Sequence, residues 1–365
     1  MGDSLRNSRG RSAVAWLVLG LLIGLTACRS GPRHTFESHR RPTSRPRPAP
    51  RTDPSFSPGA DHVLSKGLAS SSARSGTIVV AGRPIPVDAP VVPFSDPEGY
   101  DAHSTRRRFG PVESEEAPGD GELRYQPGRR LRSGDTLIAP QSTDLAALRE
   151  VVDQFVLHYD VCGTSARCFR VLHDVRGLSV HFMLDLDGTV YQCLDLRDQA
   201  WHASEANPRS IGIEIANMGA RRPGDTSDLD RWSTEDELGL RFVVPDEWRG
   251  NLPAVDFVPR PARPGRIRGP VHGEDFEMLD LTPEQYDSLV DLTVALCQIF
   301  PRLAPDAPRG ADGRVRTDAL SPQELAGFSG VLGHHHVTRR KIDPGPAFHW
   351  DLFLDRVQAQ LTPEL

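Results

Sequence analysis

Residues 181–193 read HFMLDLDGTVYQC, two short apolar runs joined by Asp187-Gly188. Apolar runs around an Asp-Gly pair are typical of a β-hairpin, because Asp and Gly adopt the conformations that a tight turn requires. Two further apolar runs, FVLH at 155–158 and IGIEIA at 211–216, flank this hairpin along the chain. Strands that alternate with helical segments predict an α/β fold with a mixed β-sheet flanked by helices.

The clearest helix signal begins at Thr282 with the sequence TPEQ. A Thr followed three residues later by Gln forms a capping box, and Pro suits the first helical position. Apolar residues recur at helical spacing as far as Phe300, so we expect this helix to pack on one face of the sheet. A shorter helix through Leu148 is expected to be capped by Ser142 or Thr143.

The length and composition of the chain predict one catalytic domain with additional segments. The chain has 365 residues, 38% of them hydrophobic, and a net charge of −6. That balance gives no indication of nucleic-acid binding. We expect residues 76–134 to form short strands and loops packed on the core, and residues 135–358 to form the main domain. Residues 220–272 are an irregular insert, too long for an ordinary connection, and either a functional lid or decoration.

The first 27 residues resemble an export signal. Arg6, Arg9 and Arg11 precede an apolar run that ends at Cys28, and this run is too short to span a bilayer. The residues LTAC at 25–28 resemble the lipobox of bacterial lipoproteins, which implies lipidation of Cys28. Because Arg29 rather than Asp follows, the resemblance implies the outer membrane, with the protein facing the periplasm. Residues 28–75 are rich in Pro, Arg and Ser and are expected to form a disordered tether.

The cysteines other than Cys28 are Cys162, Cys168, Cys193 and Cys297, and they permit three pairings. Cys162 and Cys168 enclose a short loop in a chain expected to be exported, where oxidation is permitted. A local disulfide between them is therefore the favoured prediction, with two buried thiols as the alternative. The pairing of Cys193 and Cys297 stays open.

A loop near the C-terminus concentrates groups that bind metals. Residues 333–350 read GHHHVTRRKIDPGPAFHW. Imidazole and carboxylate side chains in a loop whose backbone is restricted by Pro and Gly are suited to a divalent cation. His158, where an apolar strand meets a polar loop, is the candidate partner from the rest of the chain.

Together these motifs resemble one family. LHYD at 157–160, VHFMLDLDGTVYQ at 180–192, AWHA at 200–203, IGIEIAN at 211–217 and the loop RKIDPGPAF are similar to the N-acetylmuramoyl-L-alanine amidases of the AmpD and AmiD type, which are related to peptidoglycan recognition proteins. The resemblance implies a mixed sheet flanked by helices, one Zn²⁺ ion, and hydrolysis of the bond between N-acetylmuramic acid and L-alanine. It implies peptidoglycan or muropeptides as the substrate, and a membrane contact only through the lipid anchor.

The resemblance also assigns the site. The zinc ligands would be His158, His334 and Asp343, which leaves one coordination position for water. The spacing from His334 to Lys341 is one residue shorter than the family pattern, so His335 or His336 is an alternative ligand.

Two residues are expected to carry out catalysis. Glu214 lies on a strand face that it shares with small residues, and it is the candidate proton acceptor. Lys341 is one of only two lysines in the chain, and it is expected to stabilise the oxyanion of the tetrahedral intermediate.

His202 and Asn207 are predicted to contact substrate, with structural roles as the alternative, whereas His181 is expected to hydrogen-bond within the fold. Two other functions compete with the amidase: a recognition module that binds peptidoglycan without cutting it, and a zinc peptidase that acts on the stem peptide.

Overall fold

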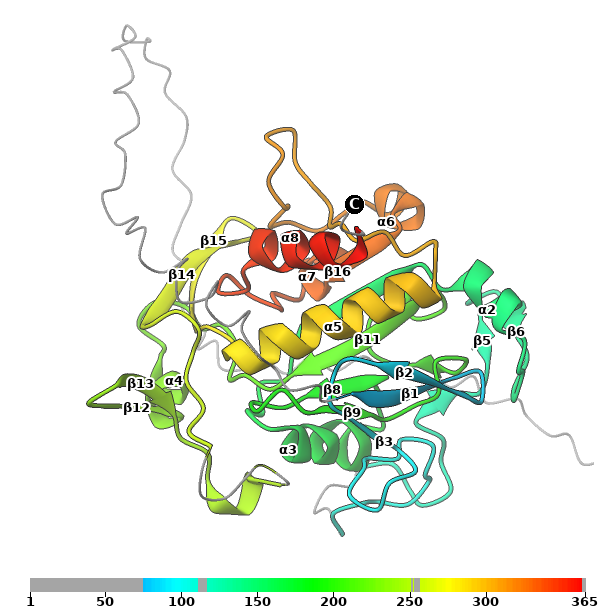
Figure 1. The fold of residues 1–365 in the computed structure, drawn as a ribbon, viewed down its shortest axis with the longest axis horizontal. Helices are drawn as coiled ribbons and strands as arrows, with labels where there is room; N and C mark the ends of the chain where they lie inside the picture. The colour runs from blue at the N-terminus through cyan, green and yellow to red at the C-terminus, as the bar shows by residue number, and fades with distance from the viewer. Residues whose placement is uncertain (1–74, 111–116, 251, 253–256, 363–365) are drawn as a thin grey trace, which may run out of the picture. The chain divides into compact units, whose positions relative to one another are not determined.

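A mixed sheet of six strands forms the centre of the computed structural model, as the sequence predicts (Figure 1). The strands lie in the order β16 (Gly330–Gly333), β7 (Gln154–Tyr159), β11 (Ser210–Ile215), β8 (Phe182–Leu184), β9 (Val190–Gln192) and β3 (Val91–Pro93). Neighbours are parallel except β8 and β9, which form the predicted hairpin. Because β16, β7 and β11 are parallel, their carboxyl ends meet at one edge of the sheet.

The structure describes residues 75–110, 117–250, 252 and 257–362. The predicted signal peptide, the tether up to residue 74 and Cys28 lie outside these ranges. Among the described residues, no helix is long and apolar enough to cross a membrane.

Helices cover both faces of the sheet (Figure 1). On one face, α5 (Pro283–Ile299) and α8 (Trp350–Leu361) lie in contact with each other. Along β7 and β8, Phe155, Leu157 and Phe182 face the core cluster that includes α5 and α8, whereas Met183 faces a second cluster with α3 (Ser165–Phe169). This alternation follows from the period of two in a strand.

The predicted capping box of α5 is confirmed, since Thr282 caps the helix and Gln285 bonds back to the cap. The cap predicted for α2 (Leu145–Val151) is wrong by one or two residues. Asp144 caps this helix, with its carboxylate accepting the N–H of Ala147 at 3.0 Å. Ser142 and Thr143 precede it, and an Asp is as good a cap as either of them.

The segment before the main domain is integrated more closely than the sequence indicates. Strands β1 (Gly76–Val80) and β2 (Arg83–Val87) form a separate hairpin, but β3 pairs with β9 and extends the central sheet. Further along, β4 (Tyr125–Gln126) pairs with β10 (Gln199–Ala200), and β5 (Arg129–Arg130) pairs with β6 (Thr136–Ile138).

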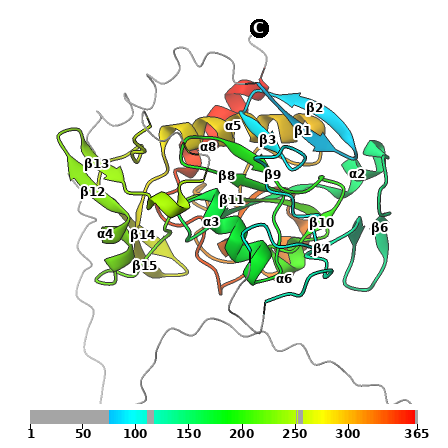
Figure 2. The same cartoon turned by 90° about the horizontal axis from the view of Figure 1, so that it is seen from below.

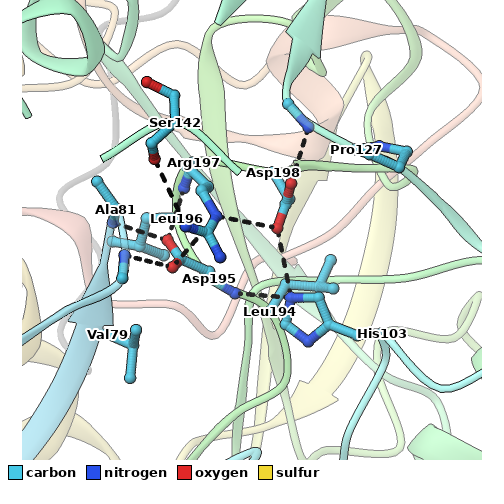
Figure 3. A network of polar contacts seen from close by, with 12 residues as sticks. Val79, Ala81, His103, Pro127, Ser142, Leu194, Asp195, Leu196, Arg197 and Asp198 are labelled. Atoms are coloured by element: carbon cyan, nitrogen blue, oxygen red, sulfur yellow. Dashed lines mark hydrogen bonds and ion pairs between the residues drawn. The ribbon is translucent and has the colours of Figure 1, made fainter. Parts of the chain in front are cut away.

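The loop at 194–198, which follows β9, fastens this segment in place (Figure 3). The carboxylate of Asp195 accepts the N–H groups of Ala81 and Gly82 at 2.8 and 2.7 Å. The carboxylate of Asp198 accepts the N–H of Gly128 at 2.8 Å and lies 3.4 Å from the imidazole of His103. Three parts of the N-terminal segment therefore attach to one loop of the main domain.

The insert at 220–272 carries regular structure of its own. It contains α4 (Ser227–Arg231), the hairpin of β12 (Ser233–Asp236) and β13 (Gly239–Phe242), and the strand β14 (Arg266–Val271), whose partner β15 (Glu274–Leu279) lies beyond it. Figure 2 shows these elements gathered at one end of the sheet. Two helices near the C-terminus, α6 (Pro322–Gly327) and α7 (His334–Val337), complete the fold.

Candidate functional site

Three buried side chains from distant parts of the sequence converge at the carboxyl ends of β7 and β16. The Nδ1 atom of His158 lies 2.9 Å from Nδ1 of His334 and 2.9 Å from Oδ2 of Asp343. The third side of this triangle, between His334 Nδ1 and Asp343 Oδ2, is 3.0 Å. Of the groups that could hold a metal, this is the one found among the described residues. We refer to it as the His-His-Asp cluster.

The protonation states of the cluster suit a cation. Burial, together with the neighbouring charge of His334, lowers the pKa of His158 to about 4. Burial acts in the opposite direction on Asp343, but His334 and His158 outweigh it and hold the pKa of this carboxyl well below its usual range. A neutral imidazole and an ionised carboxylate are the forms that bind metals. Two imidazole nitrogens and one carboxylate oxygen are a donor set that could hold a zinc ion.

Hydrogen bonds with the backbone explain why His334, and neither His335 nor His336, joins the cluster. The N–H of His335 and the carbonyl of Asp343 are hydrogen-bonded at 3.0 Å, and the same carbonyl lies 3.0 Å from His335 Nδ1. His336 accepts the N–H of Gly333 through Nδ1 and contacts the carbonyl of Arg316 through Nε2. His335 and His336 therefore fix the loop, and His334 alone reaches Asp343 Oδ2 and His158.

Glu214 lies beside the cluster on β11. Its Oε2 atom is buried and has no hydrogen-bond partner within the described part of the chain. Burial raises the pKa of Glu214 well above its ordinary value, and the charges of Asp343 and Asp160 add to the effect. A buried carboxyl without a partner is costly and is a common feature of catalytic sites.

Lys341 is exposed and lies two residues before the cluster residue Asp343. Its charge lowers the pKa of His158, which belongs to the cluster, and of Glu214, which lies beside it. The ammonium of Lys341 therefore acts on both groups. The carbonyl of Lys341 lies 2.8 Å from His272 Nε2, a contact that holds the backbone of the loop.

His202 contacts the Nε2 edge of the His158 ring, which is opposite the Nδ1 atom that faces the cluster. Its Nδ1 atom is 3.0 Å from Nε2 of His158, and its Nε2 atom is 3.1 Å from the hydroxyl of Ser210. Gly212 leaves the room for this ring, because a Cβ atom at that position would lie 2.5 Å from His202 Nδ1. The arrangement favours a role in orienting His158 over the predicted contact with substrate.

Asn207 holds the turn that carries His202. Its side-chain oxygen accepts the N–H of Ala203 at 2.6 Å and the N–H of His202 at 3.2 Å. Asn207 also lines a cavity, together with Gln199 and Trp201. The prediction missed Ser210 and Gly212, because neither residue type marks a site by itself.

His181 has the structural role expected of it. Its Nδ1 atom accepts the N–H of Gly212 at 3.0 Å, and its Nε2 atom lies 3.0 Å from the carbonyl of Asp198. The fully buried Arg129 lies 3.3 Å from the same nitrogen.

The disulfide predicted between Cys162 and Cys168 is not formed in this structure, in which both are free, buried thiols. Burial, and a hydrogen bond with Cys162, raise the pKa of the Cys168 thiol well above its ordinary value. Thiol oxidation proceeds through the thiolate, which this environment disfavours. The loop is closed instead by the carboxylate of Asp160, which accepts the N–H groups of Cys162 and Gly163. Cys193 and Cys297 are likewise free and buried.

Comparison with known proteins identifies a family. Residues 148–346, more than half of the chain, match the family model described as N-acetylmuramoyl-L-alanine amidase. No curated protein sequence matches the chain.

Two solved structures are similar to parts of the chain. One is the complex of the N-acetylmuramyl-L-alanine amidase AmiD from E. coli with the substrate anhydro-N-acetylmuramic acid-L-Ala-D-gamma-Glu-L-Lys, at 16% identity over 56% of this chain and 57% of that chain, with a TM-score of 0.32. The other is a Se-Met derivative of AmpD, at 17% identity over 65% of this chain and 92% of that one, with a TM-score of 0.29. The match thus spans little more than half of the AmiD chain.

Proposed function

The chain belongs to the N-acetylmuramoyl-L-alanine amidase family, and from this premise we propose that it is a zinc-dependent amidase. The bond that it would cut is the amide between N-acetylmuramic acid and L-alanine in peptidoglycan or muropeptides. The main observation in support is the His-His-Asp cluster, three buried residues whose ligand atoms lie together. Beside it lies Glu214, whose buried Oε2 atom has no hydrogen-bond partner among the described residues.

His158, His334 and Asp343 would hold one zinc ion. Zinc in such a site activates water as a nucleophile near neutral pH and polarises a carbonyl group. The donor set fits, since it offers two imidazole nitrogens and one carboxylate oxygen within 4.8 Å of one another.

Glu214 would move the proton. Its raised pKa makes Oε2 able to accept a proton from the attacking water and then to donate it to the departing nitrogen of L-alanine. The Oε2 atom is buried and has no hydrogen-bond partner among the described residues that would compete for this proton.

Lys341 would stabilise the charge on the reacting carbonyl, and His202 would position a zinc ligand. The ammonium of Lys341 stabilises the negative charge that develops on the carbonyl oxygen. His202 orients the ring of His158 through the 3.0 Å contact with its Nε2 atom, so that Nδ1 faces the other ligands.

Product analysis tests this function. Purified protein is incubated with sacculi and with a muramoyl tripeptide, with and without a chelator, and the products are identified by mass spectrometry. An amidase releases free stem peptide and intact muramic acid, and added zinc restores activity after chelation. Cleavage inside the stem would indicate a zinc peptidase, and tight binding without cleavage would indicate a recognition module.

The sequence before the described residues supports a proposal on location. We propose that Cys28 is lipidated and anchors the protein in the cell envelope, at the outer membrane facing the periplasm. Incorporation of an alkyne-bearing fatty acid into the wild-type protein and into Cys28→Ala tests this. Equal labelling of the two proteins, or a Cys28→Ala variant that stays with the membrane fraction, would refute the anchor.

A further inference from the structure

The insert at 220–272 ends at a hairpin whose tip touches the segment that carries Lys341. Strands β14 and β15, of six residues each, pair in an antiparallel ladder. His272 lies in the turn between them, and its Nε2 atom is 2.8 Å from the carbonyl oxygen of Lys341. Because a carbonyl oxygen only accepts, Nε2 carries the hydrogen and donates it. The insert is thus hydrogen-bonded to the residue that we place at the reacting carbonyl.

Residues 338–342, which we call the Lys341 loop, have few other hydrogen bonds. The N–H of Lys341 donates to the carbonyl of Thr338 at 3.2 Å, and the N–H of Thr338 donates to the carbonyl of His334 at 3.2 Å. In the described ranges, the hydrogen bond from His272 is the one that joins this loop to a segment distant in sequence. The backbone position of Lys341 therefore depends on the hairpin.

Apolar side chains also hold the hairpin against the loop. One buried cluster joins Val271, Phe276 and Met278 of the hairpin to Tyr159, Ala220 and Ala347, and Ile342 packs against it. Ile342 lies between Lys341 and Asp343 in the sequence. Tyr159 directly follows His158. The hairpin is therefore packed on the segments that supply His158 and Asp343 to the His-His-Asp cluster.

The turn at His272 is not the one that stability alone would select. His272 has a φ of 54° and Gly273 a φ of 81°, positive angles of the kind that a type I′ turn requires. Asn or Gly is the ordinary residue at the first of these positions, because other residues with a Cβ are strained there. The Nδ1 atom of His272 is also buried, without a hydrogen-bond partner in the described part of the chain. A strained residue with an unsatisfied nitrogen points to function rather than to packing.

The charge of Lys341 acts on the site, so its position matters. It lowers the pKa of His158 and of Glu214, which places the ammonium within electrostatic reach of both. Lys341 is exposed, and a flexible four-carbon stem separates its ammonium from the backbone. The region that the ammonium can reach is therefore set by where the backbone of the loop is held.

We propose that His272 is a positioning residue, which donates to the carbonyl of Lys341 and so holds the loop where the ammonium faces the reacting carbonyl. The insert at 220–272 then acts as a fixed support for the Lys341 loop, rather than as a lid or as decoration. The inference rests on the proposed amidase function, since it assigns the insert a part in the same reaction.

Kinetics with the muramoyl tripeptide test this role. His272→Leu removes the donor, whereas the amide N–H of His272→Gln can still donate to the carbonyl of Lys341. We expect kcat to fall about tenfold in His272→Leu, with KM and zinc content unchanged, because a displaced group stabilises the transition state less. His272→Gln should recover most of this loss. Leu238→Gln, in the turn of the other insert hairpin and 82% exposed, is the control and should behave as wild type.

Combination with Lys341→Met shows whether His272 acts through Lys341. Changes at two residues that work through one contact are not additive. Adding His272→Leu to Lys341→Met should therefore change kcat by no more than about twofold. A further tenfold loss in the double variant, or an unchanged kcat in His272→Leu alone, would overturn the positioning role.

Trypsin measures the same contact without turnover. It cleaves after Arg and Lys, and residues 339–341 are three such sites in an exposed stretch. Loss of the hydrogen bond should let the loop open more often, so cleavage there should be about fivefold faster in His272→Leu than in wild type or His272→Gln. Mass spectrometry of the fragments identifies the cut. Equal cleavage rates in the three proteins would mean that His272 does not hold the loop.

The two readouts separate this inference from the proposed function. If wild type cleaves no muramoyl substrate but the loop of His272→Leu is still cut faster, the amidase proposal fails and the hairpin stands as the support of the loop. If wild type cleaves the substrate and His272→Leu matches it in both kcat and tryptic cleavage, this inference fails and the amidase proposal stands.

Discussion

Glu214 and His158 are direct neighbours in register on the parallel strands β11 and β7. The distance between the proposed zinc ligand His158 and the proposed proton acceptor Glu214 is therefore set by the hydrogen bonds between two strands rather than by loops. A slip of one residue in this pairing would turn one side chain to the opposite face of the sheet. Sites built on paired strands hold their geometry better than sites built on loops alone.

Glu214→Gln is expected to keep the metal and lose turnover. The amide has nearly the shape of the carboxyl but cannot take a proton, so kcat should fall about 10²–10⁴-fold. Zinc content by elemental analysis and rates with the muramoyl tripeptide measure the two effects. Glu235→Gln, at an exposed position on β12, is the matched control. Turnover within a factor of two of wild type would remove Glu214 from the mechanism.

Lys341→Met is expected to lower kcat about 10²–10³-fold, the usual cost of losing one donor to a developing oxyanion. Methionine keeps the unbranched length of the side chain without its charge. Zinc content should be unchanged, because Lys341 is not one of the three clustered ligands. Arg340→Met removes a neighbouring exposed charge as the control. Equal losses in both variants would mean that loop charge in general matters, and not Lys341.

Gly212→Ala is expected to displace His202 and so to disturb His158. The added Cβ would lie 2.5 Å from the His202 ring, closer than atoms can approach. We expect a loss of about 1–3 kcal/mol in the free energy of unfolding, together with weaker zinc binding. Gly327→Ala is the control, since a Cβ there meets nothing within 4 Å. A Gly212→Ala protein with wild-type stability and zinc affinity would show that the His202 contact is dispensable.

Stability should depend on His103 between pH 6.5 and 9. Burial lowers its pKa, but hydrogen bonds to Asp101 and Asp198 outweigh this and raise the pKa from 6.5 to about 9. Because the folded-state pKa is above the unfolded value, the contribution is complete below about pH 6.5 and is lost as the pH rises through 9. The shift corresponds to on the order of 3 kcal/mol.

Urea unfolding of wild type and His103→Gln at pH 6 and pH 9.5 measures this contribution. The difference between the two proteins should shrink at the higher pH. A difference that is the same at both pH values would mean that His103 is neutral in the folded protein.

The sequence predicts local features well where the signal is contained in a few adjacent residues. The hairpin at Asp187-Gly188 and the cap of α5 at Thr282 follow from turn and cap chemistry alone. The cluster of His158, His334 and Asp343 follows from a motif resemblance, and the backbone contacts of His335 and His336 explain why only His334 joins it.

Other features depend on contacts between distant segments, which no local pattern encodes. An arginine is an unexpected residue for a core, yet Arg129 is fully buried because carbonyl groups from the loop after β9 and from the start of β11 converge on it. The same applies to His202, whose ring is placed by Gly212 and Ser210 on a neighbouring strand. The disulfide predicted between Cys162 and Cys168 is absent from this structure, and the spacing of two cysteines in the sequence does not determine whether their Cα separation suits a bridge.

The pairing of β3 with β9 limits where this chain can be truncated. The family match begins at residue 148, but β3 ends at Pro93 and forms the outermost strand of the central sheet. A truncation that starts at the family boundary would leave the hydrogen-bonding groups of β9 open to any other extended chain, which invites aggregation. The minimal folding unit is therefore larger than the segment that matches the family model.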